Sequence, residues 1–300
     1  MGKALEVIKA LVDANRWRYL LRSILGQFSS KRLRCPYCER QDYELVKRKK
    51  VATALVRCSG CKLLYRIPTD TPAFNSTFYQ DDYKAGFTTD CPSPQELERL
   101  LSSGFMGSPM EMTGRVAVLK AVGVEAGARV FDFGSSWGYG SWQLQHAGYE
   151  VQGYEISRPR ARYARELLHV PVEDEVSRIA GSFDVFFSSH VLEHLPSPRI
   201  AFDLARRLMK PGGLFIAFTP NGSFEFLRAC PEEYHTYWSI VHPLYLDDLF
   251  YRNTFPDRVK LLCSTPYGTA YDLEQISRWD RSTDLTFGLT KSELCFAYAN

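Results

Sequence analysis

From residue 110 onward, short apolar runs alternate with stretches whose apolar residues recur every three or four positions. The short runs predict buried strands, and the recurrence predicts amphipathic helices. The predicted strands are 129–134, 149–155, 183–189 and 213–219, with further strands near 258–264 and 292–300. The predicted helices are 110–122, 138–147, 158–168 and 198–209. This order predicts an α/β fold with a doubly wound, mainly parallel sheet and helices on both faces.

The first 30 residues follow a different pattern. Their apolar residues lie at helical spacing with basic residues between them, at Leu5, Ile8, Leu11, Val12, Leu20, Leu21, Ile24 and Leu25. This predicts a basic amphipathic helix or helix pair over residues 1–30. Its apolar face would pack either on the protein's own core or, through residues 1–28, on an anionic membrane surface, and the pattern fits both.

Composition and charge are those of an ordinary globular protein with one basic end. The chain is 45% hydrophobic and 24% charged, as in soluble domains. No apolar run approaches the roughly 18 residues that span a bilayer, so we expect a cytoplasmic protein, at most peripheral at the inner face of the membrane. Residues 1–66 hold 16 Lys or Arg against 5 Asp or Glu, although the whole chain carries only +3. The basic end favours an anionic neighbour.

Four of the eight cysteines form two pairs with metal-ligand spacing. Cys35 and Cys38 are followed, after nineteen residues, by Cys58 and Cys61. Two such pairs let four thiolates converge on zinc, which predicts a structural zinc ribbon over residues 31–67. Another metal or a redox pair are the alternatives. Four protein ligands leave no open position for catalysis, so we expect the ribbon to brace a neighbouring domain or to contact a partner.

Two further segments have alternative interpretations. Lys47-Arg-Lys-Lys50, inside the ribbon, would contact nucleic-acid phosphates or form a solvated turn, and the turn is favoured. Residues 68–108 interleave prolines with aromatic residues and predict no long regular element, which suits either a lid over a cofactor or a surface connector. The predicted division is therefore 1–30, 31–67, 68–108 and 109–300.

A glycine-rich segment follows the first predicted strand of the α/β part. Gly134, Gly138 and Gly140 supply the freedom in φ that a tight strand-to-helix turn needs, and they let a ligand approach the backbone. Glu155 ends the next strand, where an acidic residue accepts hydrogen bonds from both hydroxyls of a ribose. The segment predicts a nucleotide-cofactor site, and by itself it fits a dinucleotide or S-adenosylmethionine.

Two later motifs separate these cofactors. Phe183-Asp-Val-Phe-Phe-Ser-Ser-His-Val-Leu-Glu-His-Leu-Pro196 and Met209-Lys-Pro-Gly-Gly-Leu-Phe-Ile-Ala-Phe-Thr-Pro-Asn221 resemble the fourth- and fifth-strand motifs of class I S-adenosylmethionine-dependent methyltransferases. The resemblance spans about residues 110–300. It implies a seven-stranded Rossmann-like sheet whose final strands are antiparallel at one edge.

The resemblance also implies which residues hold S-adenosylmethionine. It assigns Asp132 and Gly134 to the methionine end, Glu155 to the ribose and Asp174 to the adenine amine. The other cofactor candidates lie in the same loops and strand ends: Ser135, Ser136, Gly138, Gly140, Ile156, Ser189 and His190. Ser136 departs from the family, which usually carries glycine there, and it adds a Cβ and a hydroxyl near the cofactor.

A histidine is the expected catalytic base, because its pKa suits proton removal near pH 7. The candidates are His190 and His194, which flank Val-Leu-Glu, and His235 and His242 in a later aromatic stretch. His242-Pro-Leu-Tyr-Leu resembles a segment of zinc-containing sugar C-methyltransferases in which a histidine is the base. Glu193-His194, or His235 with His242, offer only two metal ligands each, which is too few to predict a metal site.

The sequence therefore predicts an S-adenosylmethionine-dependent methyltransferase with a structural zinc ion. A ribbon joined to such a domain resembles enzymes that methylate nucleotide-linked sugars or glycans, so we expect a small, anionic acceptor of surface-polysaccharide or secondary metabolism. The first alternative is an RNA or protein methyltransferase that docks through the ribbon. The second is a binding or scaffold protein without catalysis, for which Ser135-Ser136 would be the sign.

Overall fold

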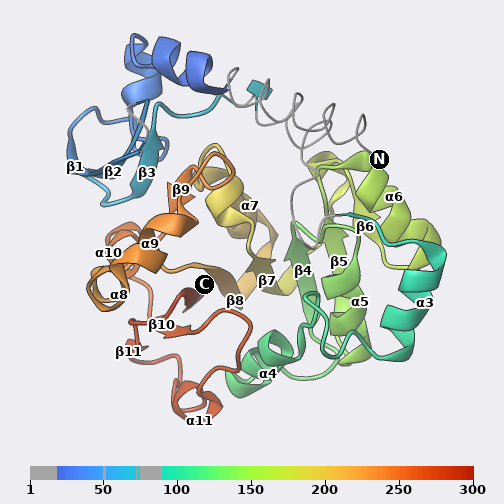
Figure 1. The fold of residues 1–300 in the computed structure, drawn as a ribbon. Helices are drawn as coiled ribbons and strands as arrows, with labels where there is room; N and C mark the ends of the chain where they lie inside the picture. Colours follow the sequence, from blue (N-terminus) through green and yellow to red (C-terminus); the bar gives the residue numbers. More distant parts are fainter. Residues whose placement is uncertain (1–18, 50–51, 72, 75–89) are drawn as a thin grey trace, which may run out of the picture.

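The computed structural model describes residues 19–49, 52–71, 73–74 and 90–300 (Figure 1). Most of the predicted N-terminal helix and several aromatic residues of 68–108 lie outside these ranges, as does Lys50. Residues 19–26 are helical, and Leu21, Leu25 and Phe28 in this region are exposed. In the described residues, no helix has the length and apolar character needed to cross a bilayer. The membrane contact, the packing on the protein's own core and the lid stay predictions.

The main sheet has eight strands in the order β11-β10-β12-β8-β7-β4-β5-β6 (Figure 1). Their bounds are β4 Arg129–Phe133, β5 Glu150–Tyr154, β6 Val172–Glu173, β7 Phe183–Ser189, β8 Met209–Pro220, β10 Lys260–Thr265, β11 Leu285–Phe287 and β12 Glu293–Ala299. Strands β6, β5, β4, β7 and β8 run parallel, whereas β12 is antiparallel to β8 and to β10. The doubly wound, mainly parallel fold is confirmed. The eighth strand, β11, lies parallel to β10 at the edge, and its three residues are too short for a recognisable pattern.

Helices cover both faces of this sheet. Successive side chains of a strand point to opposite sides, and apolar residues lie on both sides of the parallel strands, so each face needs a helical layer. Phe131 and Phe186 pack in one core with residues of α7 (Arg199–Leu208) and α10 (Asp248–Thr254). Val130 and Val185 pack in the other core with α4 (Thr113–Ala121) and α5 (Tyr139–His146). The remaining helices are α3 Pro94–Ser102, α6 Arg158–Leu167, α8 Phe224–Ala229, α9 Pro231–Tyr237 and α11 Leu273–Ile276, with the 3-10 turns η1 Ser30–Leu33, η3 Val176–Arg178 and η4 Leu192–His194. Both faces of the parallel strands are therefore buried.

The cysteine-bearing segment forms a second sheet, which the α/β part completes. Strands β1 (Tyr43–Lys49), β2 (Thr53–Cys58) and β3 (Leu64–Ile67) are antiparallel, and the fourth strand is β9 (Leu244–Tyr245). The backbone N–H of Arg66 donates to the carbonyl of Pro243 at 2.8 Å, which extends this pairing. The ribbon, predicted as a separate unit, thus shares a sheet with the segment 109–300.

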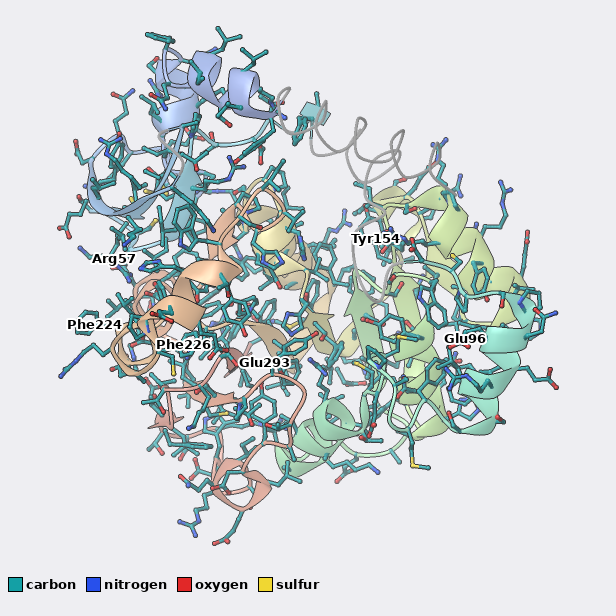
Figure 2. All side chains as sticks on the ribbon, viewed as in Figure 1. Arg57, Glu96, Tyr154, Phe224, Phe226 and Glu293 are labelled. Atoms are coloured by element: carbon teal, nitrogen blue, oxygen red, sulfur yellow. The ribbon has the colours of Figure 1, made fainter. Side chains whose placement is uncertain are left out.

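Side chains join the two parts as well. Val56 and Tyr65 of the ribbon belong to the same buried cluster as Phe250 of α10. Arg57 forms an ion pair with the fully buried Asp247 at 2.6 Å, and Figure 2 shows Arg57 beside the helices that follow β8. A shared core and a buried ion pair make independent unfolding of the ribbon costly.

Candidate active site

The loop between β4 and α5 wraps around the tip of β5. The backbone N–H groups of Gly134 and Ser135 both donate to the carbonyl of Tyr154, at 2.8 and 2.9 Å. Gly134 has φ +84 and Gly138 has φ +91, so both occupy the left-handed region. A Cβ on Gly134 would lie 2.3 Å from Cγ2 of Val191, and one on Gly138 would lie 2.7 Å from Cβ of Ala164. These glycines therefore let neighbouring elements of the protein pack against the loop.

Replacing Gly134 by alanine should destabilise the fold far more than replacing Gly127. Both residues have strongly positive φ, but an added Cβ at Gly127 meets nothing within 4 Å. We expect Gly127→Ala to cost about 1 kcal/mol from backbone strain alone, and Gly134→Ala to cost about 2 kcal/mol more from overpacking against Val191. Urea unfolding of the two variants measures this difference, and equal losses would contradict the packing argument.

Glu155 organises this loop from the end of β5. Its side chain is buried, and its two carboxylate oxygens accept hydrogen bonds from the backbone N–H groups of Ser136 at 3.0 Å and Ser157 at 2.8 Å. Burial raises the pKa of Glu155, and Arg160 at 4.0 Å opposes that rise. The carboxylate is thus fixed at the position where the sequence predicts a ribose ligand.

Ser136 keeps the backbone conformation that glycine would have. Its φ is +53, which is in the left-handed region and costs a non-glycine residue on the order of 1 kcal/mol. The hydroxyls of Ser135 and Ser136 are buried, and neither has a hydrogen-bond partner among the described residues. Two such donors beside a fixed carboxylate fit a polar ligand at this loop.

Asp132 lies below the loop, near the end of β4. It is buried, and Ser141 Oγ donates to its Oδ2 at 2.6 Å. Burial raises its pKa to about 6, and the hydrogen bond from Ser141 opposes the rise while the nearby Glu155 adds to it. Its charge therefore changes just below neutral pH.

The affinity for S-adenosylmethionine should fall about tenfold between pH 7 and pH 5. If Asp132 attracts the cationic methionine end, as the resemblance implies, only the ionised form contributes, and about a tenth of it remains one unit below the pKa. The unliganded fold should respond in the opposite direction. Because the folded-state pKa is raised, stability should increase as the pH falls through about 6. Calorimetric titrations at several pH values test the first effect, and an unchanged slope in Asp132→Asn would assign it to another group.

The other predicted cofactor residues lie around the same end of the sheet. Asp174 follows β6 and pairs with Arg165 at 3.6 Å and Arg178 at 3.4 Å, so its carboxylate is held by two guanidinium groups. Ser189 ends β7, and Ile156 follows Glu155 directly. Gly140 is the second residue of α5, where an added Cβ would lie 3.6 Å from Asp132 Oδ2. Their roles toward a cofactor stay predictions.

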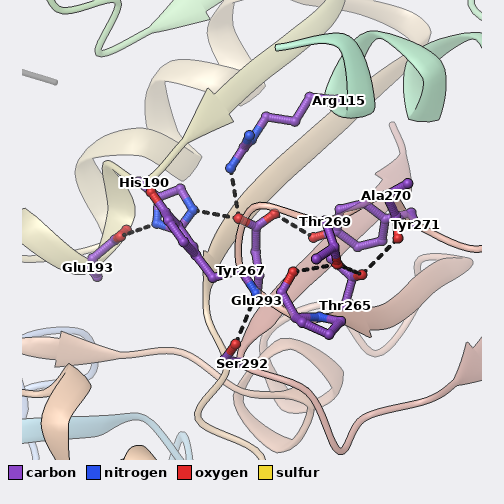
Figure 3. Close-up of polar contacts among 11 residues, drawn as sticks. Arg115, His190, Glu193, Thr265, Tyr267, Thr269, Ala270, Tyr271, Ser292 and Glu293 are labelled. Atoms are coloured by element: carbon purple, nitrogen blue, oxygen red, sulfur yellow. Dashed lines mark hydrogen bonds and ion pairs between the residues drawn. The ribbon is translucent and has the colours of Figure 1, made fainter. Parts of the chain in front are cut away.

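His190 lies between two buried carboxylates (Figure 3). Its Nδ1 is 3.1 Å from Glu193 Oε1, and its Nε2 is 2.9 Å from Glu293 Oε2. Burial favours the neutral ring, but the two carboxylates outweigh burial and raise the pKa of His190 to about 9. The ring is therefore an imidazolium at neutral pH, which cannot accept a proton.

Sequence reasoning missed Glu293, which is buried near the centre of the molecule (Figure 2). It starts β12 and also accepts hydrogen bonds from Arg115 at 2.7 Å and Tyr271 at 2.9 Å. The available signal was a single acidic residue at the head of an otherwise apolar strand. A buried charge of this kind requires partners, and those partners come from distant parts of the chain.

His194 and His242 lie together, with ring centroids 4.5 Å apart. Nδ1 of His194 is 2.7 Å from the carbonyl of Val241, and Nδ1 of His242 is 2.6 Å from the carbonyl of Tyr237. Burial lowers the pKa of His194 to about 4, although Glu193 opposes the shift. The ring of His194 is therefore neutral at pH 7 and has a nitrogen that can accept a proton, whereas the ring of His190 has none.

His235 lies elsewhere, at the end of α9. Its ring accepts a hydrogen bond from the indole N–H of Trp238 at 3.1 Å. Lys49 of β1 donates to the carbonyls of His235 and Trp238, at 3.1 and 3.0 Å. The structure therefore brings three of the four candidate histidines together and places the fourth against the ribbon.

The four cysteines converge as the spacing predicts. The Sγ atoms of Cys35 and Cys61 are 3.4 Å apart, as are those of Cys38 and Cys58, and all four lie within 4.8 Å of one another. Tetrahedral Zn–S bonds of about 2.3 Å require S–S distances of about 3.8 Å, so the donor set fits Zn²⁺. Zinc bound here would hold the ribbon together and would have no open position for a substrate.

Residues 131–217, which include the end of β4, Glu155 and the β7 motif, match the family model described as "Methyltransferase domain". Over these residues the chain is therefore similar to methyltransferase domains. Among curated proteins, the chain is similar to ubiquinone biosynthesis O-methyltransferases. The protein from Bordetella avium is 29% identical over 138 residues, which cover 39% of this chain and 57% of that protein. The protein from Psychrobacter cryohalolentis is 24% identical over 176 residues, which cover 51% of this chain and 66% of that protein.

Solved structures similar to this chain are also methyltransferases. The plantazolicin methyltransferase BpumL in complex with SAH is 10% identical, with a TM-score of 0.47 and coverage of 75% of this chain and 94% of that chain. The magnesium protoporphyrin IX methyltransferase ChlM from Synechocystis PCC 6803 is 14% identical, with a TM-score of 0.47 and coverage of 77% and 100%. Of the two curated relatives, the matched part of this chain covers 57% and 66% of their lengths, which is less than two thirds of each.

Proposed function

We propose that this protein transfers a methyl group from S-adenosylmethionine to a small molecule. The observation that carries the proposal is the clustering of the Ser135-Ser136 loop, Glu155 and His190 at the carboxyl ends of parallel strands. In open α/β sheets, ligands bind beyond these ends, where the winding direction changes. Glu293 reaches the same end, because β12 runs antiparallel to β8 and Glu293 pairs with Pro220.

The residues of the loop suit this cofactor. Glu155 would accept hydrogen bonds from the ribose hydroxyls, and Asp132 would attract the cationic methionine end. The buried Ser136 hydroxyl, which has no hydrogen-bond partner among the described residues, would donate to a polar atom of the cofactor. When bound, the cofactor supplies an electrophilic methyl group on a positively charged sulfur. His194 and His242 would accept the proton of the acceptor, which must leave for the methyl group to be transferred.

The acceptor that we propose is a nucleotide-linked sugar, a glycan or another small anionic molecule of surface-polysaccharide or secondary metabolism. The curated relatives are named as O-methyltransferases of ubiquinone biosynthesis, which supports a small-molecule acceptor. Docking of RNA on the ribbon is less well supported, because Lys49 is bound to the carbonyls at the end of α9 and lies over the ring of Trp238 at 4.7 Å.

Incubation with radiolabelled S-adenosylmethionine and either a nucleotide-sugar pool or total RNA tests the acceptor class. We expect label in the small-molecule fraction, loss of that label in Glu155→Ala, and retention in Glu150→Ala, which changes an exposed residue at the other end of β5. Label in RNA would favour the ribbon-docking alternative. A protein that binds no S-adenosylmethionine and labels neither pool would be a scaffold.

A further inference from the structure

Glu193, His194 and His242 form a three-residue cluster next to His190. Each contributes one potential ligand atom, and these atoms lie within 4.8 Å of one another. A divalent ion that bonds at about 2.1 Å joins ligand atoms up to about 4.2 Å apart, so small side-chain shifts would close the cluster around an ion. Glu193 and His194 come from η4, and His242 precedes β9. The fold therefore assembles three potential ligands from two distant segments.

The hydrogen bonds of the two histidines prepare them as ligands. A backbone carbonyl can only accept a hydrogen bond, so Nδ1 of His194 and Nδ1 of His242 must carry the protons that they share with Val241 and Tyr237. In a neutral ring, Nε2 is then the basic nitrogen. Histidines that bind metals commonly donate the other N–H to a backbone carbonyl in this way, which fixes the tautomer and the ring orientation.

Glu193 supplies a second, independent observation. Its side chain is only 1% exposed, and Oε1 is paired with His190, but in the part of the chain that the structure describes Oε2 has no hydrogen-bond partner. A buried carboxylate oxygen without a donor is costly. A carboxylate oxygen and two imidazole nitrogens are all electron-pair donors, and a cation placed among them satisfies the three together.

We propose that Glu193, His194 and His242 bind a divalent transition-metal ion, distinct from the zinc of the four cysteines. Imidazole and carboxylate ligands suit Zn²⁺, Fe²⁺, Co²⁺ and Mn²⁺, whereas the four thiolates select zinc. Three protein ligands leave positions open, as in catalytic metal sites. The site lies beside the cofactor loop, because Val191, two residues before Glu193, fills the space above Gly134.

The role of this ion follows from the proposed function and rests on it. With the ion bound, the Nε2 atoms of His194 and His242 would hold the metal and would not accept the proton themselves. An acceptor hydroxyl at an open position would then become more acidic and would release its proton to water. The resulting oxygen anion attacks the methyl carbon, a C–O bond forms, and the C–S bond breaks to leave S-adenosylhomocysteine. The acceptor class is therefore a hydroxyl compound such as a sugar or a phenol.

Cobalt binding to the full chain with zinc already on the four cysteines tests the site. We expect about one Co²⁺ per chain, with a visible spectrum that lacks thiolate charge-transfer bands, and a loss of affinity of more than about tenfold in His242→Gln and in Glu193→Gln. His146→Ala is the matched control, because it removes an exposed imidazole outside the cluster. Zinc content and circular dichroism of each variant show whether the ribbon and the fold are intact.

The outcomes separate this inference from the proposed function. Absence of cobalt binding in the wild-type chain, or binding that both variants leave unchanged, would overturn the metal site and would mean that a proton occupies the cluster. Calorimetry with S-adenosylmethionine on the same samples is independent of this result. Cobalt binding without cofactor binding would leave the metal site standing and would refute the methyltransferase activity.

Discussion

Cys58→Ser should lower the free energy of unfolding of the whole chain by more than about 4 kcal/mol, because it removes a ligand of the predicted structural zinc. The effect should not stay within the ribbon. Strand β3 pairs with β9, and Val56 and Tyr65 share a core with Phe250, so the α/β part loses packing when the ribbon opens. Denaturant unfolding followed by far-UV circular dichroism measures the loss, and metal analysis should show about one zinc fewer per chain.

Cys91→Ser is the control for this experiment. Cys91 is an exposed cysteine outside the cluster, and its replacement should change neither the zinc content nor the stability. A Cys58→Ser variant that loses zinc but unfolds at the wild-type denaturant concentration would show that the ribbon contributes nothing to the stability of the α/β part.

Glu155→Ala should weaken binding of S-adenosylmethionine by about 2–3 kcal/mol, or roughly 30- to 150-fold. The carboxylate is buried and fixed by the N–H groups of Ser136 and Ser157, so it would offer its remaining acceptor positions to the ribose without further ordering. Isothermal titration calorimetry measures the affinity. The variant also loses two hydrogen bonds of the loop, so part of the effect would come from the protein itself.

Two further variants separate these contributions. Glu155→Gln keeps one carbonyl oxygen as an acceptor and should retain part of the affinity, whereas Glu150→Ala at the exposed start of the same strand should bind as the wild type does. Wild-type affinity in Glu155→Ala would contradict the assignment of this residue to the ribose.

The strands of the main sheet were the most predictable part of the fold. The prediction of 183–189 coincides with β7 (Phe183–Ser189), because turn residues bound a run that is apolar on both faces. The prediction of 213–219 is shorter than β8 (Met209–Pro220), which also includes Pro211-Gly-Gly although Gly212 has φ +74. The pattern of apolar residues thus located the strands, whereas the start of β8 depends on its pairing with β7 and β12.

The candidate site was less predictable, because its residues interact across the sequence. His190 was expected to be a base from its motif, but Glu293, 103 positions later, helps to keep it protonated. Glu193 and His194 offered only two metal ligands in the sequence, and the packing of the His242 segment against η4 adds the third. Charge state and ligand geometry depend on such distant contacts, which a single sequence does not contain.

Strand β9 links the ribbon to the cluster of Glu193, His194 and His242, because it begins two residues after His242. The position of His242 is thus fixed from the ribbon side by the pairing of Leu244 and Tyr245 with β3. Removal of residues 1–67 would take β3 away from β9 and would leave β9 with an open, apolar edge that can pair with another molecule. A ribbon exchanged between related proteins would therefore have to include β9. Without β9, strand β3 would lack the partner that sets its pairing register.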